Sequence, residues 1–415
     1  MKFFIRTYGC RANQYDSEQA RQLLLASGGV EVDDPGSAEV ALYNSCSVTA
    51  AAEAELRKDV RRAARINPAI KSVIIGCAPG LPVRDEAVAP LRSLPTVSDA
   101  IAGADLNALA AALRLPVSAG KPQQSAQTSA RGLLRIQDGC DEHCTFCATT
   151  LARGANRSRS VRELVDEAIT LAHTHPEIVL TGIHIGSYGA DIDSSLSALV
   201  ESLIVNVPRV RFRLSSLEAT EADDRLMELF AERDRLAPYL HAPLQSGSDK
   251  ILKRMGRHWY TASSYVSAIE TIVGDYDVFG LGADVVVGFP GETEEDHLAT
   301  MKVVERLPFT SLHVFRYSRR PGTAATRLSN QVGSAEMERR SEELRDLASR
   351  KSAGYRASRA GGIADVVTIG SREGLTEDYL SVDTSDAKVA RRERFDAMLS
   401  LNGDTIVANP INKSA

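Results

Sequence analysis

The 415-residue sequence lacks long apolar runs and lacks any strong excess of one charge. No segment approaches the roughly 18 apolar residues that a membrane-spanning helix requires. Residues 1–10, MKFFIRTYGC, contain only three consecutive apolar residues and so lack the apolar stretch of a signal peptide. We therefore expect a cytoplasmic protein that does not enter a membrane. A composition of 43% hydrophobic and 25% charged residues is typical of globular proteins, and the length predicts two or three domains.

The formal net charge is −5, so the whole chain shows no excess of basic residues for nucleic-acid binding. Basic residues are nevertheless dense in three short segments, ARGANRSRSVR, KRMGR and RYSRR. Such a local patch can bind a polyanion on a mildly acidic protein, although a solvated surface with salt bridges is the alternative. The arginines that we take as candidate polyanion contacts are Arg153, Arg157, Arg159 and Arg257.

The six cysteines form two sets of three, and no cysteine lies outside these sets. A cytoplasmic protein keeps its thiols reduced, which favours metal binding or catalysis over disulfide bonds. Cys140, Cys144 and Cys147 fall within residues 139–154, GCDEHCTFCATTLARG. Zinc sites and iron–sulfur sites normally use four protein ligands, and this set lacks a fourth cysteine nearby.

Three kinds of site can be compared for this cysteine set. Zinc fits poorly, because His143 is directly adjacent to Cys144 and no partner C-x2-C pair exists elsewhere. A redox pair of Cys144 and Cys147 would leave Cys140 without a role. The remaining interpretation is a four-iron, four-sulfur cluster held by three thiolates, with one iron available to a substrate group. Phe146 would shield such a cluster from water, and burial tunes the potential of a cluster.

Residues 1–116 alternate strand and helix patterns, which predicts a parallel sheet covered by helices. Strands are expected in KFFIRTYGC, EVALYNSC and KSVIIGC, and Cys10, Cys46 and Cys77 stand at their C-terminal ends. Ligands of open parallel sheets bind beyond the carboxyl ends of the strands, so we expect these thiols to converge on one site. The alternative is three buried cysteines that act as small hydrophobic residues.

Residues 117–131 are polar and aperiodic, which indicates a linker. Residues 132–352 contain six further strand patterns: LLRIQ, EIVLTGI, VRFRLSS, YLHAPL, LGADVVVGF and SLHVFRYS. Six β/α units are fewer than the eight of a closed TIM barrel, so we expect a partial barrel with its chemistry in the loops after the strands. Residues 353–415 predict a small all-β module. The chain as a whole is therefore expected to be an α/β protein.

The motif C-x3-C-x-Φ-C, placed after the first strand of a partial barrel, resembles the signature of the radical S-adenosylmethionine (SAM) enzymes. TYGCRANQYDSE, YNSCSVT and IIGC resemble the N-terminal domain of the methylthiotransferases in that superfamily. The resemblance extends over the central domain through RIQDGC, LARG, VLTGIHIGSYG, RLSSLE, PLQSGSDKILKRMGR, DVVVGFPGET and FRYSRRPGTAA. GLTEDYLSV resembles the TRAM module, a small β-barrel that binds RNA.

This resemblance implies two [4Fe–4S] clusters and S-adenosylmethionine as cofactors. The cysteines of residues 139–154 would hold the cluster that binds S-adenosylmethionine, and the N-terminal set would hold an auxiliary cluster. Candidate cofactor contacts are Phe146, Gly182, Ser216, Glu218, Gln245 and Ser246. Turn chemistry and loop ordering are the alternatives for the polar ones. FPGETEED is expected to be mainly structural, with Thr293 and Asp296 forming a helix cap.

The implied reaction replaces a C–H bond by C–SCH3. IQDGC, LARG and TGIHIGSYG are most similar to the branch that acts on N6-threonylcarbamoyladenosine (t6A) in tRNA, at the position 3′-adjacent to the anticodon. The other branches act on isopentenyl-adenosine in tRNA and on an aspartate of a ribosomal protein. The implied partners are tRNA, a low-potential electron donor (flavodoxin or ferredoxin) and a sulfur donor. The alternative from another class is an RNA-binding iron–sulfur protein without S-adenosylmethionine chemistry.

Overall fold

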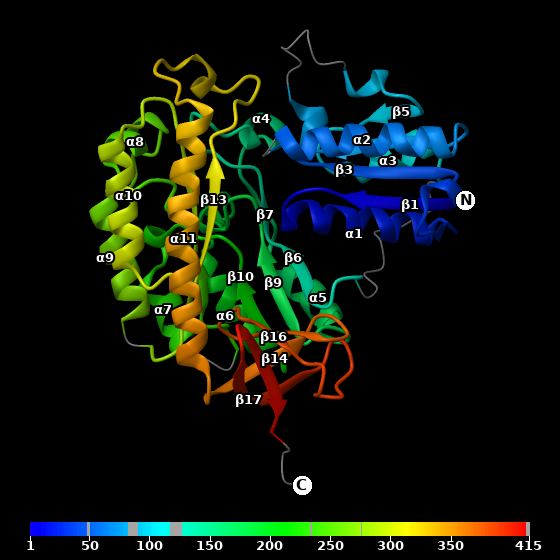
Figure 1. Cartoon of the computed structure of the whole chain (residues 1–415). Coiled ribbons are helices and arrows are strands. Elements are labelled where there is room, and N and C mark those ends of the chain that lie inside the picture. The colour runs from blue at the N-terminus through cyan, green and yellow to red at the C-terminus, as the bar shows by residue number, and fades with distance from the viewer. Residues whose placement is uncertain (48–49, 82–89, 117–126, 233–234, 275, 412–415) are drawn as a thin grey trace. The chain divides into compact units, whose positions relative to one another are not determined.

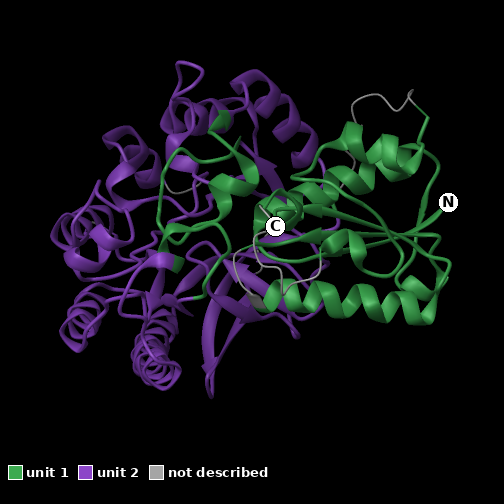
Figure 2. Cartoon of the chain, turned by 90° about the horizontal axis from the view of Figure 1, so that it is seen from above, with its two compact units in different colours: residues 1–127, 137–157, 318–326 green, residues 128–136, 158–317, 327–415 purple. Residues whose placement is uncertain are grey.

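The computed structural model describes residues 1–47, 50–81, 90–116, 127–232, 235–274 and 276–411 (Figure 1). Residues 117–126 of the expected linker lie outside the described residues. The chain divides into two compact units (Figure 2). Unit 1 comprises residues 1–127, 137–157 and 318–326, and unit 2 comprises residues 128–136, 158–317 and 327–415. The cysteine-rich segment therefore belongs to unit 1, and the units cut across the domain boundaries that the sequence pattern predicts.

Unit 1 is built on a five-stranded parallel sheet with the order β2-β1-β3-β4-β5. Its strands are β1 (Lys2–Thr7), β2 (Val30–Glu31), β3 (Val40–Ser45), β4 (Lys71–Gly76) and β5 (Val97–Ala100). The helices that cover it are α1 (Arg11–Ala26), α2 (Ala50–Ile66) and α3 (Leu106–Leu113). Side chains alternate along a strand, so Leu42 packs with α1 and α3 while Tyr43 packs with α2 on the other face. The three strands expected here are confirmed, and β2 and β5 are additional short edge strands.

Unit 2 contains the partial barrel, whose six parallel strands lie in two sheets, β6-β9-β10 and β11-β12-β13. They are β6 (Gly132–Arg135), β9 (Glu177–Thr181), β10 (Arg211–Leu214), β11 (Tyr239–His241), β12 (Gly280–Val287) and β13 (Ser311–Arg316). Parallel bridges from Phe212 to Leu236 and from Ser216 to His241 join the two sheets, so the strands follow chain order. All six strands expected from the sequence are confirmed.

Helices alternate with these strands and contribute apolar side chains to one large core. They include α5 (Val161–Ala172), α6 (Leu196–Asn206), α7 (Asp224–Ala231), α9 (Ala262–Val273) and α10 (Glu294–Arg306). The long charged helix α11 (Ser334–Arg359) packs beside β13 (Figure 1). Among the described residues, helices that combine the length and the apolar character needed to cross a bilayer are absent.

A closed β-barrel with the strand order β14-β15-β16-β18-β17 ends the described chain. Its strands are β14 (Ile363–Thr368), β15 (Glu373–Thr376), β16 (Ser381–Asp383), β17 (Arg394–Asn402) and β18 (Thr405–Pro410). The segments ADVVTIG, DYLSVDT and DTIVAN have strand patterns that predict β14, β16 and β18, whereas β15 and β17 are missed. Strand β17, RFDAMLSLN, contains no Val, Ile or Thr, and only Ala397 and Leu399 are buried in it, so its strand signal is weak.

Buried charges attach this small barrel to the partial barrel within unit 2. Glu177, at the start of β9, accepts hydrogen bonds from Arg211 Nε at 2.7 Å and from Arg213 Nε at 3.0 Å, and the three side chains are 0% exposed. Arg211 also pairs with Asp365 of β14 at 2.9 Å. Arg213 donates to the carbonyl oxygen of Thr376 in β15 at 2.9 Å. The two arginines thus connect one acidic residue of the partial barrel to two strands of the small barrel.

Candidate cluster and cofactor sites

The cysteine-rich loop runs from β7 (Gln137–Asp138) to α4 (Thr149–Arg153) in unit 1. Its two ends are tied together, because Cys140 donates its N–H to the carbonyl oxygen of Gly154 at 3.0 Å. Gly139 has φ +75°, and a Cβ there would lie 1.9 Å from the carbonyl oxygen of Ala155, so the close approach requires glycine. The three cysteines of the loop are half-buried, which leaves their thiols within reach of a bound group.

Backbone hydrogen bonds inside the loop fix the last two cysteines. Cys147 donates its N–H to the carbonyl oxygen of Cys144 at 3.1 Å, and Thr149 donates its N–H to Cys147 Sγ at 3.4 Å. An N–H directed at a thiolate stabilises its negative charge and is one of the contacts that tune an iron–sulfur cluster. Three soft sulfur donors in one half-exposed loop fit a [4Fe–4S] cluster.

Cys10, Cys46 and Cys77 lie beyond the carboxyl ends of β1, β3 and β4, where unit 1 brings them together. Asn13 Oδ1 lies 3.8 Å from the sulfur of Cys10 and 3.8 Å from the sulfur of Cys77. Gly9 has φ +92°, and a Cβ there would lie 2.6 Å from the sulfur of Cys46. Cys10 is exposed and the other two cysteines are buried, so this N-terminal cysteine set is reachable from one side.

Arg153 joins the two cysteine sets within unit 1. Its Nε donates to Cys77 Sγ at 3.3 Å, and its Nη2 donates to Asn13 Oδ1 at 2.7 Å. The guanidinium also pairs with Asp16 at 2.8 Å and with Asp138, at the base of the cysteine-rich loop, at 3.0 Å. Burial opposes the charge of Arg153, but Asp16 and Cys77 raise the pKa of the guanidinium above its ordinary value. Burial raises the pKa of the Cys77 thiol, and Arg153 opposes this rise.

The burial of Arg153 and Arg257 contradicts the prediction that these two of the four arginines contact RNA. The Arg153 side chain is 1% exposed, and each of its three nitrogens has a partner inside unit 1. Arg257, in unit 2, is buried against the rings of Trp259 and Tyr260 and forms an ion pair with Glu218. A guanidinium whose charge is already compensated in the interior does not present it to a phosphate.

Three candidate cofactor contacts lie beyond the ends of adjacent strands in unit 2. Gly182 directly follows β9, Ser216 lies beyond β10, and Gln245 lies beyond β11. Gln245 has φ +62° and donates its N–H to the carbonyl oxygen of Asp284 at 2.8 Å, which holds its backbone in the left-handed region. Ser216 is exposed and pairs with His241 across the neighbouring strand. Positions at the loop ends of barrel strands are where the chemistry of such folds is found.

Two further candidates are engaged inside the protein. Ser246 Oγ accepts the N–H of Ser248 at 3.2 Å, which is a local turn contact, and lies 3.4 Å from Thr300 Oγ1 of α10. Burial raises the pKa of Glu218, and Arg257 opposes this rise. The second oxygen of Glu218, Oε2, is buried and has no hydrogen-bond partner among the described residues, which leaves an acceptor for a bound group.

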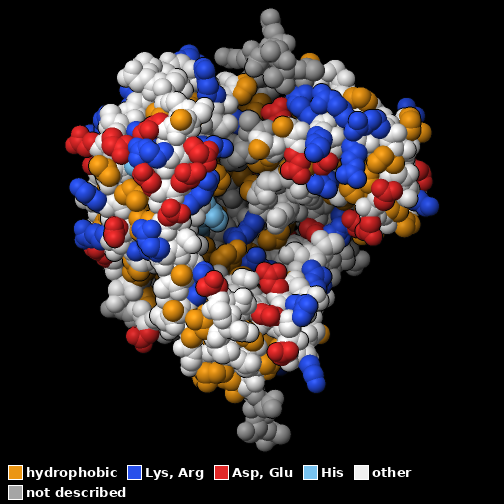
Figure 3. All heavy atoms as spheres, viewed as in Figure 1, with side chains coloured by type: hydrophobic (Ala, Val, Ile, Leu, Met, Phe, Trp, Pro, Cys, Tyr) orange, Lys and Arg blue, Asp and Glu red, His pale blue; other side chains and the backbone are white. Residues whose placement is uncertain are grey.

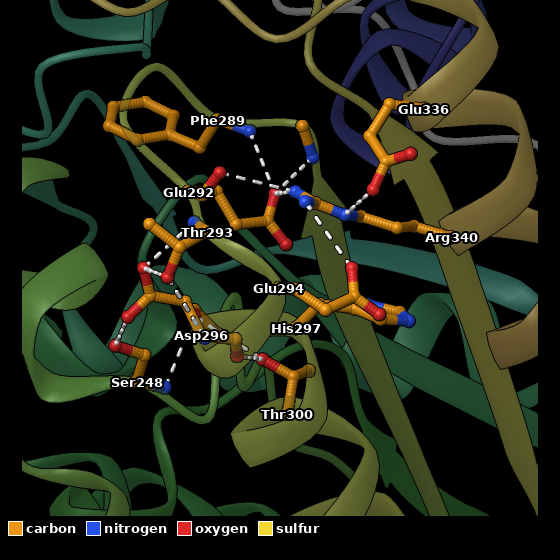
Figure 4. Close-up of polar contacts among 12 residues, drawn as sticks. Ser248, Phe289, Glu292, Thr293, Glu294, Asp296, His297, Thr300, Glu336 and Arg340 are labelled. Atoms are coloured by element: carbon orange, nitrogen blue, oxygen red, sulfur yellow. Dashed lines mark hydrogen bonds and ion pairs between the residues drawn. The ribbon is translucent and has the colours of Figure 1, made fainter.

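The segment FPGETEED leads into α10, which begins at Glu294 (Figure 4). Thr293 Oγ1 accepts the N–H of Asp296 at 3.4 Å, and Asp296 Oδ2 accepts the N–H of Thr293 at 2.9 Å. The expected helix cap is therefore confirmed as a capping box. Asp296 also accepts hydrogen bonds from Ser248 Oγ at 2.7 Å and from Lys250 Nζ at 2.6 Å, which ties the N-terminus of α8 (Asp249–Arg254) to α10.

Sequence reasoning missed the polar residues that surround these sites. Asn13 follows Cys10 at helical spacing in CRANQYD, and this spacing was the available signal. Three other polar residues, His241, Asp284 and His313, interrupt otherwise apolar strand segments of the partial barrel. A polar residue in a buried strand needs a partner, and that need is the signal by which such residues can be found.

Comparison with protein families matches two segments of the chain. Residues 2–89 match the family described as uncharacterized protein family UPF0004. Residues 134–304 match the radical SAM superfamily. The first match covers the N-terminal cysteine set, and the second covers the cysteine-rich loop and most of the partial barrel.

Curated relatives are similar over most of their length. A threonylcarbamoyladenosine tRNA methylthiotransferase of Thermotoga maritima is 35% identical over 369 residues, which cover 85% of this chain and 83% of the relative. A protein of the same name from Bacillus subtilis is 34% identical, covering 79% of this chain and 75% of the relative. A tRNA-2-methylthio-N(6)-dimethylallyladenosine synthase of Roseobacter denitrificans is 35% identical, covering 87% of this chain and 86% of the relative.

Among solved structures, a radical S-adenosylmethionine methyltransferase of Kitasatospora setae superposes with a TM-score of 0.59. Its sequence identity is 14%, and the match covers 78% of this chain and 76% of that chain, so it supports the fold alone. The expected α/β class is thus confirmed. Because relatives above 30% identity match over most of both chains, the chain belongs to the methylthiotransferase family of the radical SAM superfamily, whose members use S-adenosylmethionine and a [4Fe–4S] cluster.

Proposed function

We propose that the chain is a tRNA methylthiotransferase that replaces the C2–H bond of N6-threonylcarbamoyladenosine by a C–SCH3 bond, next to the anticodon on its 3′ side. The observation that supports this function best is the pair of three-cysteine sets in one compact unit, joined by Arg153. A single set would account for S-adenosylmethionine cleavage alone. A second set of soft sulfur donors supports a reaction that also inserts sulfur.

In this proposal the cysteines of residues 139–154 hold the cluster that binds S-adenosylmethionine, which supplies hydrogen-atom abstraction at C2. The N-terminal cysteine set would hold a second [4Fe–4S] cluster that presents the sulfur, and a second S-adenosylmethionine would supply the methyl group. Arg153 compensates the negative charge of the Cys77 thiolate and fixes Asp138 at the base of the loop. In unit 2, the residues proposed to contact the cofactor are Gly182, Ser216, Gln245 and Glu218.

The RNA-binding part of the proposal rests on exposed basic residues and on the small barrel. Arg157 is 58% exposed and is the stronger of the two remaining arginine candidates. Arg159 is 27% exposed and pairs with Glu167 at 2.7 Å. Residues 353–415 are proposed as a TRAM-like RNA-binding module, after a methylthiotransferase domain (1–116) and a radical SAM domain (132–352). A flavodoxin or ferredoxin and a sulfur donor complete the system, which we place in the cytoplasm.

The choice of t6A rests on the similarity of the motifs IQDGC, LARG and TGIHIGSYG. Relatives named for t6A and for dimethylallyladenosine reach the same 35% identity, so overall similarity does not separate the two substrates. N6-dimethylallyladenosine in tRNA is therefore the second candidate substrate.

The test of the proposed function has two steps. Protein reconstituted with iron and sulfide, then reduced with dithionite, is expected to convert S-adenosylmethionine into 5′-deoxyadenosine. Failure to form 5′-deoxyadenosine in an iron-replete sample would exclude the enzyme and favour an RNA-binding iron–sulfur protein. Mass spectrometry of tRNA nucleosides from a deletion strain is expected to show loss of 2-methylthio-t6A, whereas loss of the dimethylallyl product would overturn the choice of substrate.

Two variants separate the proposed roles of the cysteine sets. Cys144→Ser is expected to abolish 5′-deoxyadenosine formation. Cys46→Ser is expected to retain 5′-deoxyadenosine formation and to lose the methylthio product. Equal loss of 5′-deoxyadenosine in both iron-loaded variants would contradict this division of roles.

A further inference from the structure

Three neighbouring strands of the partial barrel each contribute one polar side chain to a cluster in unit 2. The residues are His241 in β11, Asp284 in β12 and His313 in β13. Asp284 Oδ1 lies 3.1 Å from His241 Nε2 and 3.2 Å from His313 Nδ1, so one carboxylate oxygen contacts both imidazoles. The two imidazole rings lie 5.4 Å apart between centroids. His313 and Asp284 are direct partners in the strand register, which fixes their separation.

The cluster is buried on one side and open on the other. The His241 side chain is 10% exposed, Asp284 is 26% exposed and His313 is 63% exposed. Burial would raise the pKa of Asp284, but the hydrogen bonds from His241 and His313 hold the pKa of that carboxyl well below its usual range. The ionised carboxylate therefore acts as an acceptor that orients both rings, and His313 presents this arrangement to the solvent.

Gly282 lets polar side chains of the neighbouring strands approach β12 closely beside the cluster. A Cβ at this position would lie 2.6 Å from Tyr239 Oη, 2.8 Å from His241 Nδ1 and 2.9 Å from Ser311 Oγ. Three polar atoms from two neighbouring strands thus surround the place where a side chain would be. The inner surface of these strands is consequently a hydrogen-bonding surface rather than an apolar one.

The backbone of the same cluster supports a candidate cofactor contact. The carbonyl oxygen of Asp284 accepts the N–H of Leu244 at 3.1 Å and the N–H of Gln245 at 2.8 Å. His241 also pairs with Ser216 across β10 and β11. A group bound by the cluster would therefore lie near Gln245 and Ser216, two of the residues proposed to contact S-adenosylmethionine.

We propose that His241, Asp284 and His313 bind the substituent on N6 of the substrate adenine, and that they select a polar carbamoyl-linked amino acid over an apolar prenyl group. This inference rests on the proposed function and deepens it by choosing between the two substrate names of the relatives. A threonylcarbamoyl group offers carbonyl and carboxylate acceptors and hydroxyl and N–H donors. The imidazole nitrogens that do not contact Asp284, together with the Asp284 carboxylate, are the complementary partners.

Desolvation gives the direction of the selectivity. A dimethylallyl group placed on this surface would remove water from the histidines and the aspartate and would return no hydrogen bond. Sites built to hydrogen-bond a substrate group reject analogues that lack it by up to about 10⁴–10⁵-fold. The same three side chains could instead hold a divalent metal, since two histidines and one carboxylate are a known ligand set; the test separates these outcomes.

The test uses reconstituted full-length protein with S-adenosylmethionine and three anticodon stem-loop RNAs that carry t6A, dimethylallyladenosine or adenosine at the same position. Fluorescence anisotropy gives Kd for each RNA. The wild-type protein is expected to bind the t6A RNA at least about tenfold more tightly than the other two, the effect of one good hydrogen bond. His313→Phe and Asp284→Asn are expected to bind all three RNAs with similar Kd values.

His297→Gln is the matched control, because His297 forms a histidine–carboxylate pair with Glu343 at 2.8 Å on α10 and α11, also in unit 2. This variant is expected to keep the preference for t6A. The inference is overturned if His313→Phe and Asp284→Asn keep the preference as well, or if the wild-type protein prefers the dimethylallyl RNA. It is also overturned if elemental analysis finds a non-cluster metal that both variants lose. Absence of 5′-deoxyadenosine formation by the wild type would instead count against the proposed function.

Discussion

The positive charge of Arg153 is held in the interior of unit 1, where 1% of its side chain is exposed. A buried charge is tolerated only when it is paired and hydrogen-bonded. Asp16 and Asp138 provide the opposite charges, and Asn13 and Cys77 accept further hydrogen bonds from the guanidinium. The same side chain therefore stabilises unit 1 and supplies a hydrogen bond to a thiol of the N-terminal cysteine set.

Replacing Arg153 by Met is expected to destabilise the protein by about 3–5 kcal/mol, because Asp16, whose side chain is 0% exposed, loses its partner. Urea denaturation followed by circular dichroism measures the change. Arg157→Met is the matched control, since Arg157 is 58% exposed and its loss is expected to change stability by less than about 0.5 kcal/mol. An unchanged denaturation midpoint for Arg153→Met would show that the ion pairs with Asp16 and Asp138 do not stabilise unit 1.

The residues of the candidate site differ in how far the sequence reveals them. The cysteines stand out in the sequence as candidate ligands because few residue types bind iron, and the spacing of the thiols is visible in the chain. Arg153 and Arg157 lie in one basic segment, yet only one of them is buried. The difference depends on Asn13 and Asp16, which lie far away in the sequence and meet Arg153 only in the folded unit.

The start of α10 shows how one helix end connects several elements (Figure 4). Thr293→Ala removes the cap acceptor and is expected to cost about 1 kcal/mol of unfolding free energy. Asp296→Ala is expected to cost more, because Asp296 also accepts hydrogen bonds from Ser248 and Lys250. Thermal denaturation of the two variants measures the difference.

The capping box of α9 provides the control for this prediction. Thr261 and Ser264 form the same reciprocal hydrogen bonds, but their contacts are exposed and local. Thr261→Ala is therefore expected to match Thr293→Ala, whereas Ser264→Ala should cost less than Asp296→Ala. If Ser264→Ala and Asp296→Ala lower the unfolding free energy equally, the hydrogen bond from Ser248 to Asp296 adds no stability.

Strands were predictable to the extent that their side chains show β propensity. All six strands of the partial barrel contain apolar residues and were expected. Five of them are largely buried between the helices and the barrel interior, whereas β13 is partly exposed. Strand β17 was missed because it lacks β-branched residues, and β2 has only two residues. Strand β17 forms by pairing with β14 and β18, and β2 forms by pairing with β1. The local sequence does not encode these pairings.

At the scale of unit 2, the small barrel depends on the charge of Glu177. Burial would raise the pKa of Glu177, but Arg213 and Arg211 hold it well below its ordinary value of 4.5. Glu177→Gln leaves the buried Arg213 without its counter-ion and leaves Arg211 with Asp365 alone, so it is expected to cost about 3–5 kcal/mol. Glu201→Gln is the control, because its partner Arg225 is 40% exposed, and exposed pairs contribute about 1 kcal/mol or less.

The pH dependence follows from the sign of this shift. A carboxyl with a lowered pKa in the folded state contributes stability above its unfolded pKa, and the contribution is lost as the pH falls toward the folded pKa. Wild-type stability in urea is therefore expected to decline as the pH falls below about 4.5, the ordinary value for Glu177. Glu177→Gln should show a shallower decline over the same range. Parallel declines for the two proteins would contradict the role of the Glu177 carboxylate.

A chain with a net charge of −5 must bind tRNA, as proposed, through local basic surfaces rather than through its total charge. Lys and Arg side chains gather over α2 in Figure 3. The exposed basic residues of this helix are Lys58, Arg61, Arg62 and Arg65. Each phosphate contact releases counter-ions, so log Kd depends on log salt concentration with a slope of about 0.7–0.9 per contact.

The double variant Arg61→Gln, Arg65→Gln is expected to weaken tRNA binding at low salt. Loss of two phosphate contacts should also reduce the slope by about 1.4–1.8. Filter binding of tRNA between low and moderate salt measures both quantities. Arg225→Gln removes an exposed arginine that is already paired with Glu201 and Glu228, so its slope should equal that of the wild type. A double variant with an unchanged slope would exclude α2 from the tRNA interface, and the basic surface would then have to be sought around Arg157.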